Sequence, residues 1–210
     1  MLRICIALLL LPAALVLLAG TARTETLGEA RIGFSAERVL TFDGHRYVGH
    51  MWQMPGEQRH EQQLPALKPV FILHDGDSVA DLVLPKLHTV IEFRLPPALA
   101  ALHRPGLLKR PLGHERIDGL MTTKYAIDEA TPDGRANGLI WLSTDGIPMR
   151  VDGSFRAVGG KVTKVRWELH HVRLGPQPAA LFEVPHGYSK LPPEAAAALL
   201  GLRLAKPAGH

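Results

Sequence analysis

Apolar and polar residues alternate along many short segments of this 210-residue chain. From Ile147 to Phe155, and again from Lys161 to Leu174, one set of alternate positions is apolar and the other carries charged residues. A two-residue period places successive side chains on opposite faces of a β-strand. We therefore expect antiparallel strands with one buried face and one solvated face.

Turn residues separate these segments at the spacing of β-hairpins. Asp43-Gly44 and Pro55-Gly56 are the first examples, and Asp118-Gly119 and Gly159-Gly160 follow later. The pattern predicts about ten strands. They span Ile32–Phe42, His45–Met54, Glu57–Leu64, Val70–His74, Val79–Leu84, His114–Asp118, Leu120–Ile127, Ala136–Ser143, Ile147–Phe155 and Lys161–Leu174. A sheet of this size tends to curl.

Two segments do not fit the strand pattern. Leu95–Leu112 is rich in proline, which lacks the N–H that a central strand needs, so we predict a crossing loop around a short helical piece, Ala98–His103. A second short helix is expected at Ala195–Leu204, after Pro192-Pro193. The predicted fold class is mainly β, a strongly curved antiparallel sheet that forms an unclosed β-barrel with a short covering helix or loops.

The first residues have the organisation of a secretory signal peptide. Arg3 precedes the apolar run Ile4–Leu18, and small residues follow as far as Ala22. The chain's one cysteine, Cys5, lies near the start of this run, so lipid anchoring is not expected. We predict a signal peptide at 1–22, a β domain at 23–188 and a tail at 189–210, with a periplasmic location and no stable membrane anchor after cleavage.

Several classes of function lack support in the sequence. The formal charge is +4, but the basic residues are scattered, which argues against nucleic acid as a partner. The serines form no nucleophile elbow, and no glycine-rich loop precedes a helix. The 11 histidines are dispersed, and Asp118 fits a turn better than a carboxylate pair with Glu115. We therefore predict no enzymatic activity, no cofactor and no metal.

Bulky apolar side chains on the expected inner face are the candidate ligand-binding residues. Large, flexible side chains on one face of a curved sheet can line an apolar cavity, although ordinary core packing would use the same residues. The candidates are Phe34, Leu40, Met121, Trp141, Met149 and Trp167.

The second half of the chain resembles a known superfamily. The residues that carry the resemblance are Gly113, Glu115, Gly119, Thr122, Lys124, Tyr125, Trp141, Gly146, Pro148, Phe182, Pro185, Gly187 and Tyr188. In this order they are similar to the outer-membrane lipoprotein carrier (LolA/LolB-like) superfamily, in its uncharacterised periplasmic branch. The resemblance implies an unclosed β-barrel with an apolar cavity that accepts acyl chains.

Two functions are compatible with these observations. The first is a non-enzymatic periplasmic binding protein that holds an acyl chain, a lipid or a lipidated protein against a concave apolar face. The second is a structural or sensor module of the cell envelope that binds a protein partner and has a self-filled core.

Overall fold

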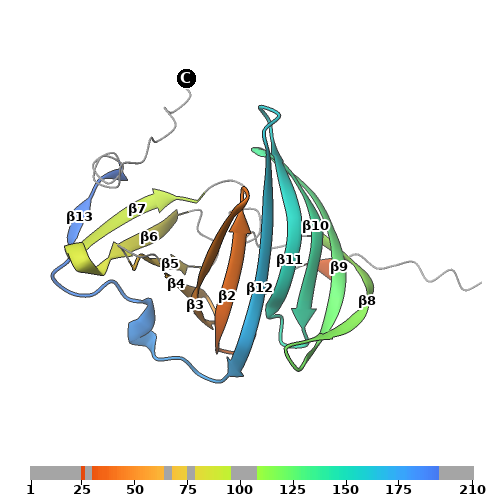
Figure 1. The fold of residues 1–210 in the computed structure, drawn as a ribbon, viewed down its shortest axis with the longest axis horizontal. Coiled ribbons are helices and arrows are strands. Elements are labelled where there is room, and N and C mark those ends of the chain that lie inside the picture. The colour runs from red at the N-terminus through yellow and green to blue at the C-terminus, as the bar shows by residue number, and fades with distance from the viewer. Residues whose placement is uncertain (1–24, 27–29, 64–67, 75–78, 96–107, 194–210) are drawn as a thin grey trace, which may run out of the picture.

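The described residues form one curved sheet that does not close into a barrel (Figure 1). The structure is a computed structural model, and it describes residues 25–26, 30–63, 68–74, 79–95 and 108–193. The predicted fold class is confirmed. The signal peptide and the two predicted short helices lie outside the described residues. Within the described part, no helix has the length and apolar character needed to cross a membrane.

The sheet has 13 strands in the order β1-β8-β9-β10-β11-β12-β2-β3-β4-β5-β6-β7-β13. Their bounds are β1 Glu25–Thr26, β2 Phe34–Phe42, β3 His45–Met54, β4 Glu57–Gln62, β5 Val70–His74, β6 Val79–Leu84, β7 Thr89–Arg94, β8 Leu108–Ile117, β9 Leu120–Thr131, β10 Gly134–Ser143, β11 Pro148–Ala157, β12 Val162–Leu174 and β13 Ser189–Leu191. Two 3-10 helices, η1 (Pro85–Leu87) and η3 (Ala179–Phe182), lie in the connections.

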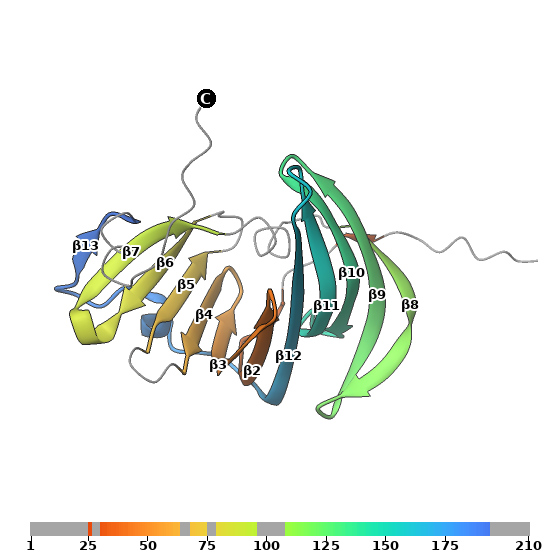
Figure 2. The same cartoon turned by 45° about the horizontal axis from the view of Figure 1, so that its top comes forward.

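Two antiparallel meanders make up the sheet, one from β2 to β7 and one from β8 to β12 (Figure 2). They join where β12 pairs with β2, with Trp167 opposite Leu40 and Leu169 opposite Arg38. Short strands pair at the two ends: β1 with β8, and β13 with β7. The β13–β7 pairing is parallel, whereas all the other pairings are antiparallel.

The Asp-Gly turns explain the hairpin geometry. Asp43 and Gly44 both have positive φ, at 49° and 83°, and Asp118 and Gly119 have φ of 49° and 80°. Two consecutive positive φ angles are those of a type I′ turn, whose twist matches that of the flanking strands. The predicted turns at these positions are therefore confirmed.

One face of the sheet carries the main core, and we call it the core face. It is defined by Leu40, Ile140, Val151 and Trp167, which are cross-strand neighbours on β2, β10, β11 and β12. All four side chains are buried in a cluster that includes Phe34, Met149 and Leu169. We call the other side the opposite face, and it carries Arg150 and Glu168.

The segment after β12 covers the opposite face of the first meander. Val184 and Tyr188 pack against a cluster that includes Val70 and Ile72 of β5. The guanidinium of Arg59 on β4 donates a hydrogen bond to the carbonyl oxygen of Leu181, at 2.8 Å. This segment leads to β13, so the chain crosses below β2–β6 before it rejoins the sheet (Figure 1).

The structure adds strands that the sequence pattern did not indicate. β7 and the short strands β1 and β13 were not predicted, and β8 begins at Leu108 rather than at His114. The prediction of a loop through Leu112 was wrong at its C-terminal end. Pro111 is tolerated in β8 because β1 pairs only with Leu108 and Lys109, and the register shifts between Pro111 and Gly113.

Candidate functional site

Four of the six predicted ligand-binding residues lie together on the core face. Phe34 and Met149 have no exposed surface, Trp167 is 5% exposed and Leu40 is 8% exposed. Leu40 and Trp167 face each other across the β2–β12 pairing. The structure thus brings these four residues into one apolar cluster, and their role in ligand binding stays a prediction.

The other two predicted residues are placed differently. Trp141 belongs to the same buried cluster, but its cross-strand neighbours are Arg150 and Lys124, so it lies on the face away from Trp167. It is buried because the cationic groups of Lys124 and Arg150 cover its ring, at 5.0 and 5.3 Å from the centroid. Met121, near the β8–β9 turn, is 46% exposed. The apolar character of Trp141 and Met121 did not predict where they lie, because alternate residues of a strand point to opposite faces of the sheet.

An apolar hollow lies on the core face of the second meander. It is shallow: its cavity volume is about 20 Å³, on the order of the space that one water molecule needs, and it opens to solvent. Its floor is at Gly138 and Gly153, which face each other across β10 and β11 and have no side chains to fill the space. Around them stand apolar side chains from four strands: Ile127, Ala136, Val151, Phe155 and Val165. Pockets that enclose a small ligand typically have roughly 300–1,000 Å³, so an acyl chain would lie along this hollow rather than be enclosed by it.

Beyond Trp167 the core face changes from apolar to polar. β4 has the sequence Glu-Gln-Arg-His-Glu-Gln, without an apolar residue. Its core-face side chains, Gln58, His60 and Gln62, are nevertheless buried, at 8%, 2% and 7% exposure. Polar groups in such a place need hydrogen-bond partners, because burial removes their water.

Arg38 lies at the centre of this polar region. It occupies the apolar phase of β2, between Ala36 and Leu40, and is 4% exposed. Its cross-strand neighbour on β3 is Gly49, where an added Cβ would lie 1.9 Å from the carbonyl oxygen of Glu61. A glycine is therefore required there. Gly49 has no side chain to separate Arg38 from β4, so Arg38 reaches His60.

Arg38 makes one strong polar contact. Its Nη1 donates to Nδ1 of His60 at 2.8 Å, and because arginine only donates, Nδ1 is the acceptor. His60 Nε2 lies 3.2 Å from Oε1 of Gln58. The Trp167 ring completes the group: its centroid is 6.0 Å from Cζ of Arg38 and 5.8 Å from the His60 ring.

Three nitrogens of Arg38 and Trp167 remain without a partner. Nε and Nη2 of Arg38 and Nε1 of Trp167 are buried and have no hydrogen-bond partner among the described residues. Burial lowers the pKa of the Arg38 guanidinium to about 10, without a contribution from a neighbouring carboxylate. The side chain therefore remains a cation at neutral pH.

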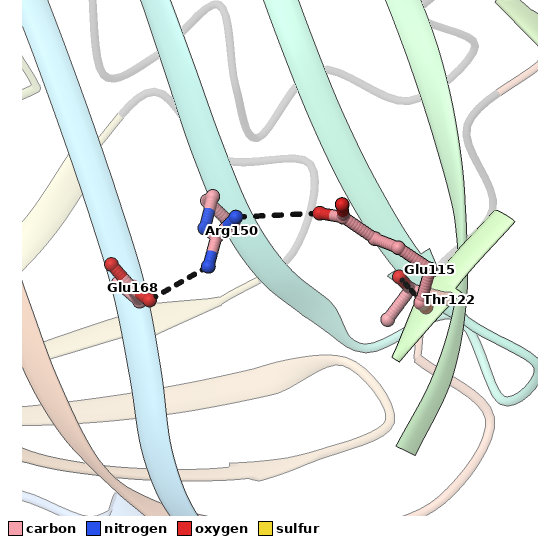
Figure 3. Close-up of polar contacts among 4 residues, drawn as sticks. All are labelled: Glu115, Thr122, Arg150 and Glu168. Carbon is pink, nitrogen blue, oxygen red and sulfur yellow. Dashed lines mark hydrogen bonds and ion pairs between the residues drawn. The ribbon is translucent and has the colours of Figure 1, made fainter. Parts of the chain in front are cut away.

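The opposite face has a different arrangement of charges, in which Arg150 is paired with carboxylates (Figure 3). Arg150 donates to Glu168 at 2.9 Å and to Glu115 at 3.3 Å, linking β11 to β12 and to β8. Thr122 Oγ1 donates to the backbone oxygen of Glu115 at 2.7 Å. The Asp118 carboxylate accepts the Val172 N–H at 2.7 Å, which fixes the β8–β9 turn beside β12. These contacts are structural ties between strands.

The histidines do not form a metal site in the described part of the chain, where no three His, Cys, Asp or Glu side chains are grouped as ligands. His50 pairs with Glu61 and His60 with Met51 across β3 and β4, so the two histidines lie on opposite faces. Sequence analysis did not select Arg38 or His60. The signal that could have found Arg38 is its position in phase with Phe34, Ala36 and Leu40.

No family model and no curated protein matches the chain. Similar solved structures include an uncharacterized conserved protein from Thermus thermophilus, with 14% identity, a TM-score of 0.48 and coverage of 77% of this chain and 90% of that chain. They also include the MucA/MucB complex of Pseudomonas aeruginosa, with 16% identity, a TM-score of 0.41 and coverage of 71% and 54%. A LolA superfamily protein from Nitrosomonas europaea has 11% identity, a TM-score of 0.43 and coverage of 75% and 92%.

A member of the superfamily that the sequence resembles is thus among these structures. The chain spans about half of the matched chain in the MucA/MucB structure. With TM-scores below 0.5, these likenesses carry no argument about function.

Proposed function

We propose that the protein is a non-enzymatic, exported binding protein that holds an acyl chain, of a lipid or a lipidated protein, against its core face. The hollow above Gly138 and Gly153 is the observation that carries this proposal. Its surroundings are almost entirely apolar, and apolar surface left in water costs about 25 cal/mol per Å². An acyl chain would remove that surface from water, and Trp167 of β12 and Leu40 of β2 continue the apolar face beside it.

A fluorescent fatty-acid probe tests the proposal. The wild-type protein should increase the emission of the probe, and unlabelled lipid should displace it. Ala136→Leu, which adds volume beside the floor of the hollow, should weaken binding by at least about tenfold. Val158→Leu adds volume at a position that is 79% exposed, so it is the matched control and should bind as the wild type does.

Export to the periplasm is part of the proposal. Sequencing the N-terminus of the mature protein should show cleavage after Ala22 or within a few residues of it. A secreted chain that still begins at Met1 would contradict the signal-peptide assignment.

A partner-binding module is the second candidate, and the edge of β8 favours it. β1 covers only Leu108 and Lys109, which leaves Arg110–Ile117 without a neighbouring strand on that side in the described part of the sheet. An exposed edge can receive a strand from another protein. If the folded protein binds neither the probe nor lipid, the core is self-filled and this second function replaces the first.

A further inference from the structure

Among the described residues, Arg38 is a buried arginine that pairs with no carboxylate, and this distinguishes its part of the core face. Elsewhere in the described part, arginines with comparable contacts have carboxylates beside them: Arg59 has Glu61, Arg135 has Asp128 and Arg150 has Glu168. Arg38 is more deeply buried than any of these arginines, yet among the described residues its guanidinium hydrogen-bonds only to the ring of His60. An uncompensated buried charge is costly for a fold.

We propose that Arg38 binds the oxyanion of an amphiphilic ligand, a carboxylate or a phosphate, whose alkyl chain lies in the hollow beyond Trp167. This inference deepens the proposed function and rests on it. Arginine is suited to the task because its planar fork can donate two hydrogen bonds to one oxyanion.

The unused donors match this ligand. Nε and Nη2 of Arg38 and Nε1 of Trp167 are three buried N–H-bearing nitrogens on two side chains that contact each other, with Cζ of Arg38 6.0 Å from the Trp167 ring centroid, and an oxyanion is acceptor-only. The contact with His60 uses Nη1, and the Nε and Nη2 side of the fork has no hydrogen-bond partner among the described residues. His60 holds the guanidinium in place from the side of β4.

The placement relative to the hollow fixes the orientation of the ligand. Along β12, Val165 borders the hollow, Trp167 follows on the same face, and Leu169 lies opposite Arg38 on β2. Residues two apart on a strand are about 6.6 Å apart, so Val165 and Leu169 are about 13 Å apart along β12, and Arg38 lies one strand further, across about 5 Å. An amphiphile can span that distance with its chain over Gly138 and its charged end at Arg38.

Matched ligands test the inference on the wild-type protein without a mutation. Dodecanoate and dodecyl phosphate should each bind at least about tenfold more tightly than dodecanol, which has a chain of the same length but no charge. The charged ligands should also shift the indole N–H resonance of Trp167, which can be assigned because the chain has three tryptophans. Equal affinity for dodecanoate, dodecyl phosphate and dodecanol would overturn the inference and leave the proposed function standing.

Arg38→Met supplies the second test, with Arg166→Met as its control. Arg166 lies on β12 and is exposed. Its replacement by methionine removes the same positive charge as Arg38→Met, but from the surface. Arg38→Met should abolish the preference for charged ligands, keep the affinity for dodecanol and raise the melting temperature of the ligand-free protein, because a buried unpaired charge is removed. A lower melting temperature with an unchanged ligand preference would show that Arg38 is structural.

Inorganic phosphate distinguishes a headgroup site from a site for the free anion. If no amphiphile binds, the proposed function fails. A shift of the Trp167 indole resonance by phosphate that Arg38→Met removes would then support the oxyanion site by itself. The absence of any shift with phosphate and with both charged amphiphiles would overturn the inference.

Discussion

Several interactions converge on Trp167. It lies at the joint of the two meanders, pairs across strands with Leu40 and Val151, and has Arg38 and His60 beside its ring. Its indole N–H is buried and has no hydrogen-bond partner in the part of the chain that the structure describes. Packing, rather than hydrogen bonding, therefore accounts for the contribution of Trp167 to stability.

Replacing this side chain should destabilise the protein strongly. Trp167→Ala should lower the free energy of unfolding by about 3–5 kcal/mol, because a large buried side chain leaves a cavity. Trp167→Phe should cost less, since it keeps part of the volume and removes the unpartnered N–H. Urea denaturation measures both, and Val158→Ala, at a position 79% exposed, serves as the control. A change below about 1 kcal/mol for Trp167→Ala would contradict the packing argument.

Asp81 provides a prediction about pH. Burial raises its pKa above the ordinary value of 3.8, repulsion from Glu92 raises it further, and Lys190 opposes the shift. A raised carboxyl pKa in the folded state means that the stability contribution of Asp81 is complete below the ordinary pKa. It is lost as the pH rises through the folded-state value.

Removing Lys190 should therefore raise the pKa of Asp81. Lys190 Nζ lies 2.8 Å from Oε2 of Glu92, and Glu92 is directly opposite Asp81. In Lys190→Ala, an NMR titration of the Asp81 carboxyl should show a higher midpoint than in the wild type. Lys161→Ala removes a charge that pairs with Asp43 at another turn and should leave the midpoint unchanged. A lower midpoint in Lys190→Ala would contradict the assignment.

At the scale of the strands, close packing of β10 on β11 forms the floor of the hollow. A Cβ at Gly138 would lie 2.5 Å from both the Asp152 carbonyl oxygen and the Gly153 Cα, and its φ is +153°. Gly138→Ala should therefore destabilise the protein by about 1–3 kcal/mol. Gly159→Ala, where the added Cβ meets nothing within 4 Å, should be close to neutral. Thermal melts of the two variants make the comparison, and equal stability would show that the strands can separate without cost.

Strand positions could be predicted where the alternation of apolar and polar residues shows which side chains face the core. Alternation and Asp-Gly turns located β2–β6 and β9–β12, because these signals are local. β13 has three residues and β1 has two, and each exists through pairing with a distant strand, which no local pattern records. The start of β8 was hidden by Pro111, whose acceptability depends on its place at the edge.

The same distinction applies to the site. Phe34, Leu40, Met149 and Trp167 were found because apolar residues in the buried phase are a local signal. Trp141 is also a large apolar residue, but its side chain lies on the opposite face of the sheet, where Lys124 and Arg150 cover it. Arg38 is a charged residue at a position of β2 whose side chain faces the core. Its contact with His60 depends on the pairing of distant strands, which the local sequence does not show.

For the whole molecule, the pairing of β2 with β12 makes one folding unit out of two meanders. The main core cluster draws Phe34, Leu40 and Met51 from the first meander and Val165 and Trp167 from the second. Neither meander can bury its share of this cluster alone, because the partners lie across the joint. We therefore predict a single cooperative unfolding transition.

Tryptophan fluorescence can test this cooperativity, because Trp52 lies on β3 of the first meander and Trp141 on β10 of the second. Two variants that each retain one of these residues, with the other tryptophans changed to phenylalanine, should have their own urea midpoints. Within each variant, the midpoint by fluorescence should coincide with the midpoint by far-ultraviolet circular dichroism. A fluorescence transition at Trp52 that precedes loss of the sheet signal would show that the first meander unfolds separately. In that case the β2–β12 joint would not couple the hollow on one side to the Arg38 region on the other.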